Sequence, residues 1–257
     1  MIIGLQQTIS PAGDIPAGVC VIEQALADAS RSGIDMLVMP ELFLPGYNSV
    51  TPSRPPGWDA VIAGLGDMCR RHETALTIGL PEYAPDAVYN AAFVFGPDGT
   101  ELARYRKAQL FGPREHSLFA AGDQHVVFDH RGVRFGLLIC YDVEFPEHTR
   151  ALSRAGAKVI LVPTANMMPF VNVSQLLVPA RAAETATTIV YANYCGAEGD
   201  LTYTGLSTIC GPDGYALAAK GTGPGQISAA LPGNWSEHDI PHSTQLADLR
   251  AVRDPEV

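Results

Sequence analysis

Several residues with reactive side chains stand where apolar strands are predicted to end, and a cysteine is the clearest of them. The run Phe135–Ile139 is continuously apolar, which is typical of a strand buried on both faces, and it leads directly to Cys140. Pro146 and Glu147 then suit the first turn of a helix. Near a helix N-terminus, partial positive charge and free backbone N–H groups favour a thiolate and can hold an oxyanion. The pattern predicts a nucleophile at Cys140, and an inert buried thiol is the alternative.

Two further segments place a charged side chain at the end of a predicted strand. Ile34–Met39 leads through a proline, which cannot continue a sheet ladder, to Glu41. Glu101–Arg106 begins after a Gly-Pro-Asp-Gly turn and leads to Lys107, and Glu115 lies one short loop further on. Each charge taken singly is typical of a solvated surface, so the prediction rests on the set.

Together these residues meet the requirements of acyl transfer from nitrogen. Glu41 can take the thiol proton as the Cys140 sulfur attacks, then protonate the departing amine and later activate water. Lys107 and the backbone N–H of Tyr141 can stabilise the oxygen that becomes negative in the tetrahedral intermediate. Glu115, placed beside Lys107, would keep that ammonium charged and oriented in a dry pocket.

The motifs that carry these residues resemble those of the nitrilase superfamily of carbon–nitrogen hydrolases. The matching segments are Pro40–Tyr47, Tyr105–Lys107, Leu110–Glu115 and Leu138–Glu147. The similarity continues as far as Ser207 and so covers almost all of the chain. The resemblance implies a catalytic set of Glu41, Lys107 and Cys140, with Glu115 as a supporting second glutamate.

The predicted secondary-structure elements occur in the same order in the two halves of the chain, which indicates an internal repeat. Val88–Ala103 and Thr202–Ala218 each read as a strand, a Gly-Pro-Asp-Gly turn and a second strand. Upstream, each half reads as strand, helix, strand, helix, strand, with helices expected at about 15–32, 57–72, 145–155 and 173–187. Strands buried on both faces need a covering layer on each side. The chain is therefore expected to adopt an α/β fold, a four-layer α-β-β-α sandwich with an internal pseudo-two-fold repeat, and the resemblance implies the same fold.

Length and composition fit one domain. With 257 residues and 47% apolar content, residues 1–257 can bury a large core, followed by a polar C-terminal tail from about residue 234. The net charge of -10 argues against nucleic-acid and anionic-membrane partners. No targeting segment or membrane span is recognisable. Five scattered cysteines fit reduced thiols in a cytoplasmic protein better than a disulfide framework.

No cofactor or metal is predicted, because the seven histidines show no metal-ligand spacing beside the cysteines. The expected partner is a small-molecule amide substrate. The family resemblance and the prevalence of symmetric assemblies imply a homodimer or a higher homo-oligomer.

Candidate substrate-binding residues are nominated by their position. In the second half of the repeat, Thr164, Ala165 and Asn166 occupy the place that Glu41 holds in the first half, so they are expected to border the same cleft. Tyr47, just beyond Glu41, is expected to form another wall or to hydrogen-bond an amide. Ordinary loop packing is the alternative for each. The apolar character of this region suits a small, largely uncharged acyl group.

The leading hypothesis is an amidase that cleaves a primary carboxamide to the acid and ammonia through a Cys140 thioester, because the stretch from Pro163 to Gly205 most resembles small bacterial amidases. A nitrilase and an N-carbamoyl hydrolase would use the same nucleophile. We rank them lower because the chain is short for a nitrilase and offers only Arg114 and Arg150 as candidates for recognising a carboxylate. A non-catalytic or redox-sensing thiol protein is disfavoured, since all four catalytic positions carry the expected residue types.

Overall fold

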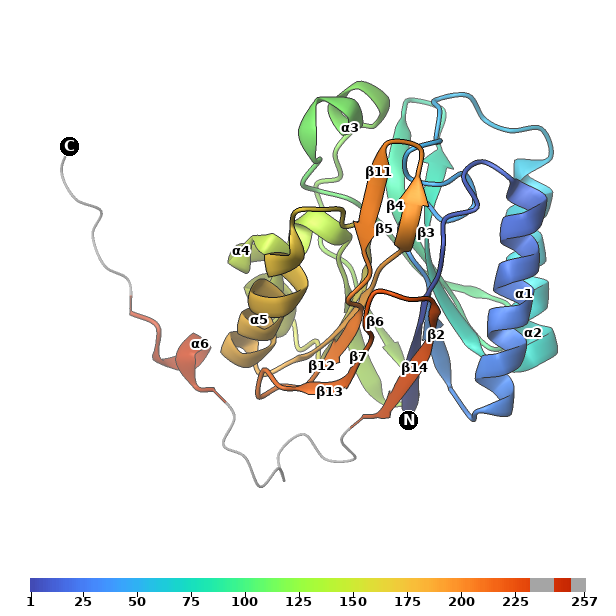
Figure 1. Ribbon diagram of the computed structural model, residues 1–257. Helices are drawn as coiled ribbons and strands as arrows, with labels where there is room; N and C mark the ends of the chain where they lie inside the picture. The colour runs from blue at the N-terminus through green and yellow to red at the C-terminus, as the bar shows by residue number, and fades with distance from the viewer. Residues whose placement is uncertain (232–242, 251–257) are drawn as a thin grey trace.

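The computed structural model describes residues 1–231 and 243–250, and its core is a pair of six-stranded sheets packed face to face (Figure 1). In spatial order the first sheet consists of β14 (Gly225–Ala230), β1 (Ile2–Gln7), β2 (Met36–Val38), β3 (Ala75–Tyr83), β4 (Val88–Phe95) and β5 (Glu101–Arg106). In spatial order the second sheet consists of β13 (Ala216–Ala219), β12 (Thr208–Cys210), β9 (Thr188–Ala192), β8 (Val159–Pro163), β7 (Val133–Leu137) and β6 (Val127–His130). A separate two-stranded ribbon is formed by β10 (Cys195–Glu198) and β11 (Leu201–Thr204).

Helices cover the outer face of each sheet, which confirms the four-layer α-β-β-α order expected from the sequence (Figure 1). The helices are α1 (Ile15–Arg31), α2 (Trp58–His72), α3 (Gly112–Leu118), α4 (Pro146–Arg154), α5 (Val178–Thr185) and α6 (Gln245–Asp248). A 3₁₀ helix at Cys140–Glu144 precedes α4, and a π-helical turn at Val173–Leu177 precedes α5. The α1–α2 pair lies on the side of the first sheet and the α4–α5 pair on the side of the second.

The first long helix shows how local sequence produces these elements. The side chain of Asp14 accepts a hydrogen bond from the N–H of Ala17 and so caps the helix, while a proline occupies its first turn, where a missing N–H costs nothing. Residues three and four apart form its buried face, namely Ile22, Ala25, Leu26 and Ala29. Packing of this face holds the helix against the sheet that contains β2, the strand that leads to Glu41.

The pseudo-two-fold repeat predicted from the sequence is present in the strand order. In the first sheet β1, β2, β3, β4 and β5 are neighbours in chain order, and in the second sheet β7, β8, β9, β12 and β13 follow the same order. The first three strands of each set are parallel, and the last two are added antiparallel. Each set gains one more antiparallel strand, β14 beside β1 and β6 beside β7.

The second hairpin of the repeat departs from the sequence prediction. The run from Thr202 to Cys210 was expected to be one strand, but it forms β11 in the ribbon and β12 in the second sheet. The chain turns between them at Gly205 and Leu206, whose φ angles are 64° and 55°. An extended ladder cannot continue through two residues in the left-handed region, so the single-strand prediction was wrong here.

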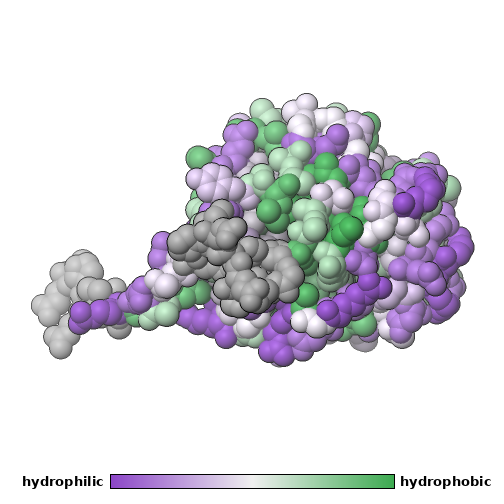
Figure 2. Space-filling model, turned by 90° about the horizontal axis from the view of Figure 1, so that it is seen from below, coloured by the Kyte–Doolittle hydropathy of each residue, from purple (hydrophilic) through white to green (hydrophobic). Residues whose placement is uncertain are grey.

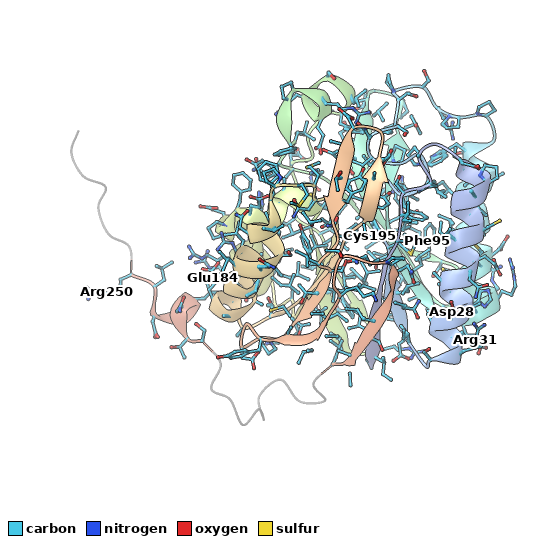
Figure 3. The ribbon with its side chains drawn as sticks, viewed as in Figure 1. Asp28, Arg31, Phe95, Glu184, Cys195 and Arg250 are labelled. Atoms are coloured by element: carbon cyan, nitrogen blue, oxygen red, sulfur yellow. The ribbon has the colours of Figure 1, made fainter. Side chains whose placement is uncertain are left out.

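The cysteines other than Cys140 lie in the core or on the surface, as predicted. Cys69, Cys195 and Cys210 are buried, Cys20 is exposed, and all four are free thiols. Figure 3 shows Cys195 near the middle of the molecule, where the β10–β11 ribbon begins. The expected tail boundary near residue 234 lies outside the described residues. Within the described part of the chain, no helix is both long enough and apolar enough to cross a membrane.

The two ends of the sandwich differ. Parallel strand β1 begins at the lower end of Figure 1, so the carboxyl ends of the parallel strands point to the upper end, near α3. Seen from below, the flanks of the molecule are largely hydrophilic, and hydrophobic side chains gather in a strip beside the grey atoms (Figure 2). Ligands of open α/β sheets bind beyond the carboxyl ends of the strands, which directs attention to the upper end.

Candidate active site

The charged residues predicted from the sequence meet beyond the ends of β2 and β5 of the first sheet, beside the end of β8 of the second sheet. Glu41 follows β2, and its backbone N–H donates to the carbonyl of Thr164, which follows β8 of the opposite sheet, at 3.3 Å. Lys107 directly follows β5, and its backbone N–H donates to the carbonyl of Asn90 in β4. These hydrogen bonds fix the backbone positions from which the side chains of Glu41 and Lys107 extend.

Lys107 lies between two carboxylates. Its Nζ donates to Oε1 of Glu41 at 2.7 Å and to Oε1 of Glu115 at 2.8 Å. The three side chains are almost completely buried, at 0% exposure for Lys107 and Glu41 and 1% for Glu115. Glu41 Oε1 also accepts from Nδ2 of Asn90 at 2.7 Å, whereas its Oε2 has no partner within the described residues. One oxygen of Glu41 is thus held in place, and the other is available to a substrate or a thiol.

Glu115 is oriented by two further donors. Tyr47 Oη donates to its Oε1 at 2.7 Å, and the backbone N–H of Phe111 donates to its Oε2 at 3.0 Å. Glu115 belongs to the short helix α3, which the sequence analysis had interpreted as a loop. The hydroxyl of Tyr47 is therefore engaged with Glu115, so this residue contributes its ring to the site rather than a free hydrogen-bonding group.

Cys140 is the first residue of the 3₁₀ helix and has a φ angle of 44°, which is unusual for a residue other than glycine. Asp142 holds this turn, because its carboxylate accepts from the N–H of Ile139 at 3.0 Å and from the hydroxyl of Tyr105 at 2.9 Å. Tyr141 is the second residue of the helix, where backbone N–H groups have no acceptor inside the helix. The helix predicted to begin at Pro146 does begin there, as α4, and the turn before it is a 3₁₀ helix.

Burial and charge act in opposite directions on the ionisable groups. Burial raises the pKa of Glu41 above its usual 4.5, and the Lys107 ammonium opposes that shift. Burial lowers the pKa of Lys107, but the carboxylates of Glu41 and Glu115 more than compensate and hold it well above 10.5. Lys107 is therefore a permanent cation, and Glu41 is a more basic carboxylate than an exposed glutamate.

The thiol of Cys140 behaves differently from the sequence prediction. Burial and the nearby Glu41 carboxylate raise its pKa well above 9.0, against the opposing effect of Lys107 and a hydrogen bond from the backbone of Ala165. The expected preference for a thiolate was wrong because desolvation of the anion outweighs the helix terminus. In the resting site, Cys140 is a thiol that needs a base to become a nucleophile.

A small pocket of about 210 Å³ opens onto Cys140. Its lining consists of aromatic, apolar and polar side chains, namely Tyr47, Phe111, Cys140, Tyr141, Glu144, Asn166, Met167 and Phe170. Tyr47 and Asn166, which were nominated from the sequence as substrate-binding residues, lie in this lining. Thr164 and Ala165 are fully buried behind it, and their contribution is through the main chain, to Glu41 and Cys140 respectively. A strand end buried on all sides leaves only the backbone of these two residues near the site.

Several residues of the site were not assigned roles from the sequence. Asn90 lies inside β4 with no local signal, and the pairing of β2 with β3 and of β3 with β4 brings it to Glu41. Asp142 and Glu144 lie within the segment that carries the family resemblance, so their position was visible although their contacts were not. Phe111 forms a wall of the pocket and packs edge to face against Tyr141, with ring centroids 5.2 Å apart.

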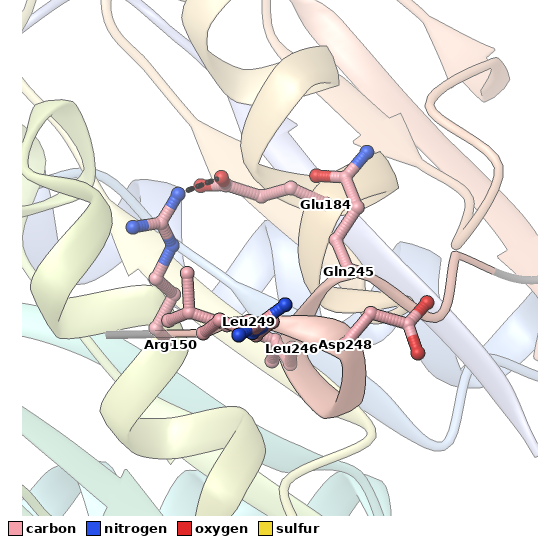
Figure 4. A pocket seen from close by; sticks show the side chains of 7 residues that line it. Arg150, Glu184, Gln245, Leu246, Asp248 and Leu249 are labelled. Carbon is pink, nitrogen blue, oxygen red and sulfur yellow. Dashed lines mark hydrogen bonds and ion pairs between the residues drawn. The ribbon is translucent and has the colours of Figure 1, made fainter. Parts of the chain in front are cut away.

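Neither arginine considered as a carboxylate clamp lies in the lining of this pocket. The guanidinium of Arg114 donates to the backbone carbonyls of Tyr47, Asn48 and Val50 and so ties down the loop after β2. Arg150 pairs with Glu184 of α5 at 2.7 Å, in a separate pocket beside α6 (Figure 4). Both guanidinium groups therefore make structural contacts within the protein. Within residues 1–231 and 243–250, no cluster of three or more His, Cys, Asp or Glu side chains is placed to hold a metal ion.

Comparisons with known proteins agree with this geometry. The family model for carbon-nitrogen hydrolases matches residues 2–236. A Pseudomonas protegens protein named "Hydrolase in pqqF 5'region" is 38% identical over 224 residues, which cover 85% of this chain and 78% of that protein. An (R)-stereoselective amidase from a Pseudomonas species is 36% identical over 191 residues, which cover 73% of this chain and 69% of that enzyme.

Solved structures show the same likeness. The crystal structure of an amidase from Nesterenkonia sp. superposes with a TM-score of 0.87 at 36% identity, covering 97% of this chain and 93% of that one. A cysteine-to-alanine variant of that amidase in complex with butyramide gives a TM-score of 0.88 at 36% identity, covering 97% and 94%. Another variant carries the acetamide moiety of fluoroacetamide on its active-site cysteine. The family match and the shared fold show that this chain belongs to the carbon–nitrogen hydrolases of the nitrilase superfamily.

Proposed function

We propose that this chain is an amidase that hydrolyses small carboxamides to the carboxylic acid and ammonia through a thioester on Cys140. The observation that carries the proposal is the buried Glu41–Lys107–Glu115 array at 2.7 and 2.8 Å, next to a thiol that opens onto a pocket of about 210 Å³. The binding of butyramide by a solved relative supports the same substrate class.

In the first half-reaction, Oε2 of Glu41 takes the thiol proton while the Cys140 sulfur attacks the amide carbon. The carbonyl π electrons move to the oxygen, and the resulting oxyanion is held by the Lys107 ammonium and the backbone N–H of Tyr141. Collapse of this intermediate breaks the carbon–nitrogen bond, and the nitrogen leaves as ammonia with the proton that Glu41 had stored. Cys140 then carries the acyl group as a thioester.

The second half-reaction repeats these roles with water in place of the thiol. Glu41 removes a proton from the water as its oxygen attacks the thioester carbon, and the same oxyanion contacts hold the intermediate. Breaking of the carbon–sulfur bond releases the acid, and the sulfur recovers its proton from Glu41. Glu115 touches neither substrate nor thiol in this scheme and acts by positioning Lys107.

The same nucleophile would serve a nitrilase or an N-carbamoyl hydrolase, so these two activities and the amidase must be distinguished by which substrates the protein hydrolyses. Among the described residues, the pocket lining contains no arginine or lysine that would recognise the carboxylate of a ureido acid, which favours the amidase. The homo-oligomeric state and the cytoplasmic location remain predictions from the sequence. Light scattering of the purified chain would test the first, and fractionation of producing cells would test the second.

An ammonia-release screen tests the proposal. Short aliphatic amides, amino-acid amides, ureido acids and nitriles are presented separately to the wild-type chain, and intact-protein mass spectrometry follows a slowly hydrolysed amide. We expect ammonia from carboxamides and an acyl adduct that peptide mapping places on Cys140. Ammonia release from nitriles alone, or an oxidised but never acylated Cys140, would contradict the proposal. The exposed thiol of Cys20 serves as the internal control, because it should remain unmodified by the amide.

A further inference from the structure

One carboxylate lines the pocket without a role in the proposed reaction. Glu144 is the last residue of the 3₁₀ helix that begins at Cys140, and it is half-buried. Among the eight described residues that line the pocket, it alone is an acid, and none is a lysine, arginine or histidine. A ligand of this pocket is therefore enclosed by walls that include both this carboxylate and Cys140.

The Glu144 carboxylate is left free by the surrounding protein. Within the described residues, no donor hydrogen-bonds to its side chain, whereas its backbone carbonyl accepts from Nη2 of Arg181 at 2.7 Å. Arg181 directs its other terminal nitrogen to Glu184, at 3.4 Å. Burial raises the pKa of Glu144 above its usual 4.5, and the charges of Lys107 and Arg181 oppose that shift. The Glu144 carboxylate is therefore available to bind a ligand in the pocket.

Within the described residues, the two cations whose charges act on Glu144, Lys107 and Arg181, make no hydrogen bond to its carboxylate. Lys107 is paired with Glu41 and Glu115, and Arg181 is paired with Glu184 and binds only the backbone carbonyl of Glu144. Arg114, in α3, is engaged with backbone carbonyls of the loop that carries Tyr47. In a pocket with low-dielectric walls, an excess of one sign of charge attracts ligands of the opposite sign and repels those of the same sign.

The walls of the pocket also suit a cation. Phe111 packs edge to face against Tyr141 and Phe170, with centroids 5.2 and 5.9 Å apart, so aromatic rings line the space that Glu144 faces. Aromatic faces attract ammonium groups through their quadrupole. A volume of about 210 Å³ restricts the ligand to a short molecule.

We propose that Glu144 determines substrate specificity, by selecting short carboxamides whose acyl chain carries a protonated amine and rejecting those that carry a carboxylate. This inference rests on the proposed amidase function and changes the uncharged acyl group expected from the sequence to a cationic one. The amide carbonyl faces Lys107 and Tyr141, and the ammonium of the acyl chain pairs with the Glu144 carboxylate.

Three substrates of similar size and different charge test the inference. They are butyramide, 3-aminopropanamide and succinamate, which are neutral, cationic and anionic at pH 7. For the wild-type chain, we expect kcat/KM to be highest for the cation and lowest for the anion. In Glu144→Gln, the ratio of kcat/KM for 3-aminopropanamide to that for butyramide should fall about tenfold or more, because one charge pair is lost. The ratio for succinamate to butyramide should rise.

The exposed neighbour Glu147, in the first turn of α4, provides the matched control, since Glu147→Gln removes the same charge outside the pocket. Both ratios should keep their wild-type values in that variant. Unchanged ratios in Glu144→Gln would overturn the inference. An equal loss of kcat/KM for all three amides would also overturn it, because the carboxylate would then act in a step common to every amide. If Glu144→Gln does not fold, a wild-type preference for succinamate over 3-aminopropanamide overturns it and the reverse order supports it. Failure of the wild-type chain on all three amides would instead contradict the amidase function itself.

Discussion

Lys107 and Glu41 form a 2.7 Å ion pair at zero solvent exposure, and only one of the two Glu41 oxygens takes part in it. The two oxygens of Glu41 therefore have different roles. Oε1, shared with Asn90, keeps Glu41 in register with Lys107, and the unpartnered Oε2 is the oxygen available for proton transfer. A symmetric, doubly paired carboxylate would hold the lysine equally well but would be a poor base.

Removal of the nucleophile should abolish turnover and spare the fold. We expect Cys140→Ala to lose at least about a thousandfold in kcat/KM, because no other described residue in the pocket lining offers a thiol. Ammonia release from butyramide measures the loss, and circular dichroism checks folding. Cys20→Ala, on the exposed face of α1, should keep wild-type activity. Activity retained in Cys140→Ala would place the nucleophile elsewhere.

Lys107→Met should damage both catalysis and stability. An uncharged side chain of similar length cannot hold the oxyanion, so kcat/KM should fall by about 10²- to 10³-fold. The substitution also leaves Glu41 and Glu115 buried without their cation, which should lower the free energy of unfolding by about 3–5 kcal/mol. Urea denaturation measures this change. Lys158→Met, at an exposed position, is the control and should change neither quantity.

Glu115→Gln should leave partial activity. The amide can still accept from Lys107 and Tyr47, but the loss of a charged acceptor weakens the hold on the ammonium by about 1.5–3 kcal/mol, which corresponds to roughly a 10- to 100-fold lower kcat. Steady-state kinetics with the amide that Cys140 hydrolyses fastest measure it. Equally mild effects of Glu115→Gln, Lys107→Met and Cys140→Ala would mean that the catalytic set is misassigned.

The acid limb of the pH–rate profile should lie above pH 4.5. Burial raises the pKa of Glu41, so as the pH falls this carboxylate is protonated, and ceases to be a base, sooner than an ordinary glutamate. On the alkaline side, the raised pKa of Lys107 keeps its charge beyond pH 10.5. Measurement of kcat/KM against pH, with circular dichroism at each pH, tests this. Constant activity down to pH 4.5 in the folded protein would contradict the role of Glu41.

Asp142→Ala should loosen the turn that presents the nucleophile. Its carboxylate accepts from the N–H groups of Ile139 and Gln109 and from the hydroxyl of Tyr105, and the variant leaves these buried or half-buried donors without their acceptor. We expect a loss of about 3 kcal/mol in the free energy of unfolding, together with a lower kcat. Asp129→Ala is the control.

Asp129 makes an exposed pair with Arg134 on the second sheet, and loss of such a pair costs below about 1 kcal/mol. A loss of stability in Asp142→Ala no greater than that of the control would show that the turn is held by its backbone alone. Thermal or urea unfolding of the two variants beside the wild type makes the comparison.

Local patterns in the chain predicted the elements and most of the catalytic set. Prolines, turn signals and apolar runs identify strand ends without any partner strand, and together with the family resemblance they nominated Glu41, Lys107 and Cys140. The repeated order of strands and helices similarly predicted the four layers, because strands buried on both faces require a second sheet and covering helices. These features depend on neighbours within a few residues along the chain.

Only the tertiary structure decided which atoms face one another. The bond from Asn90 to Glu41, the main-chain contributions of Thr164 and Ala165, and the exposure of Glu144 to the pocket all depend on how two sheets pack. The pKa of Cys140 also depends on tertiary structure. Burial and the carboxylate of Glu41, which is far away in sequence but near in space, raise it despite the helix terminus. Residue types and strand ends are written along the chain, whereas desolvation and hydrogen-bond direction arise when segments far apart in sequence come into contact.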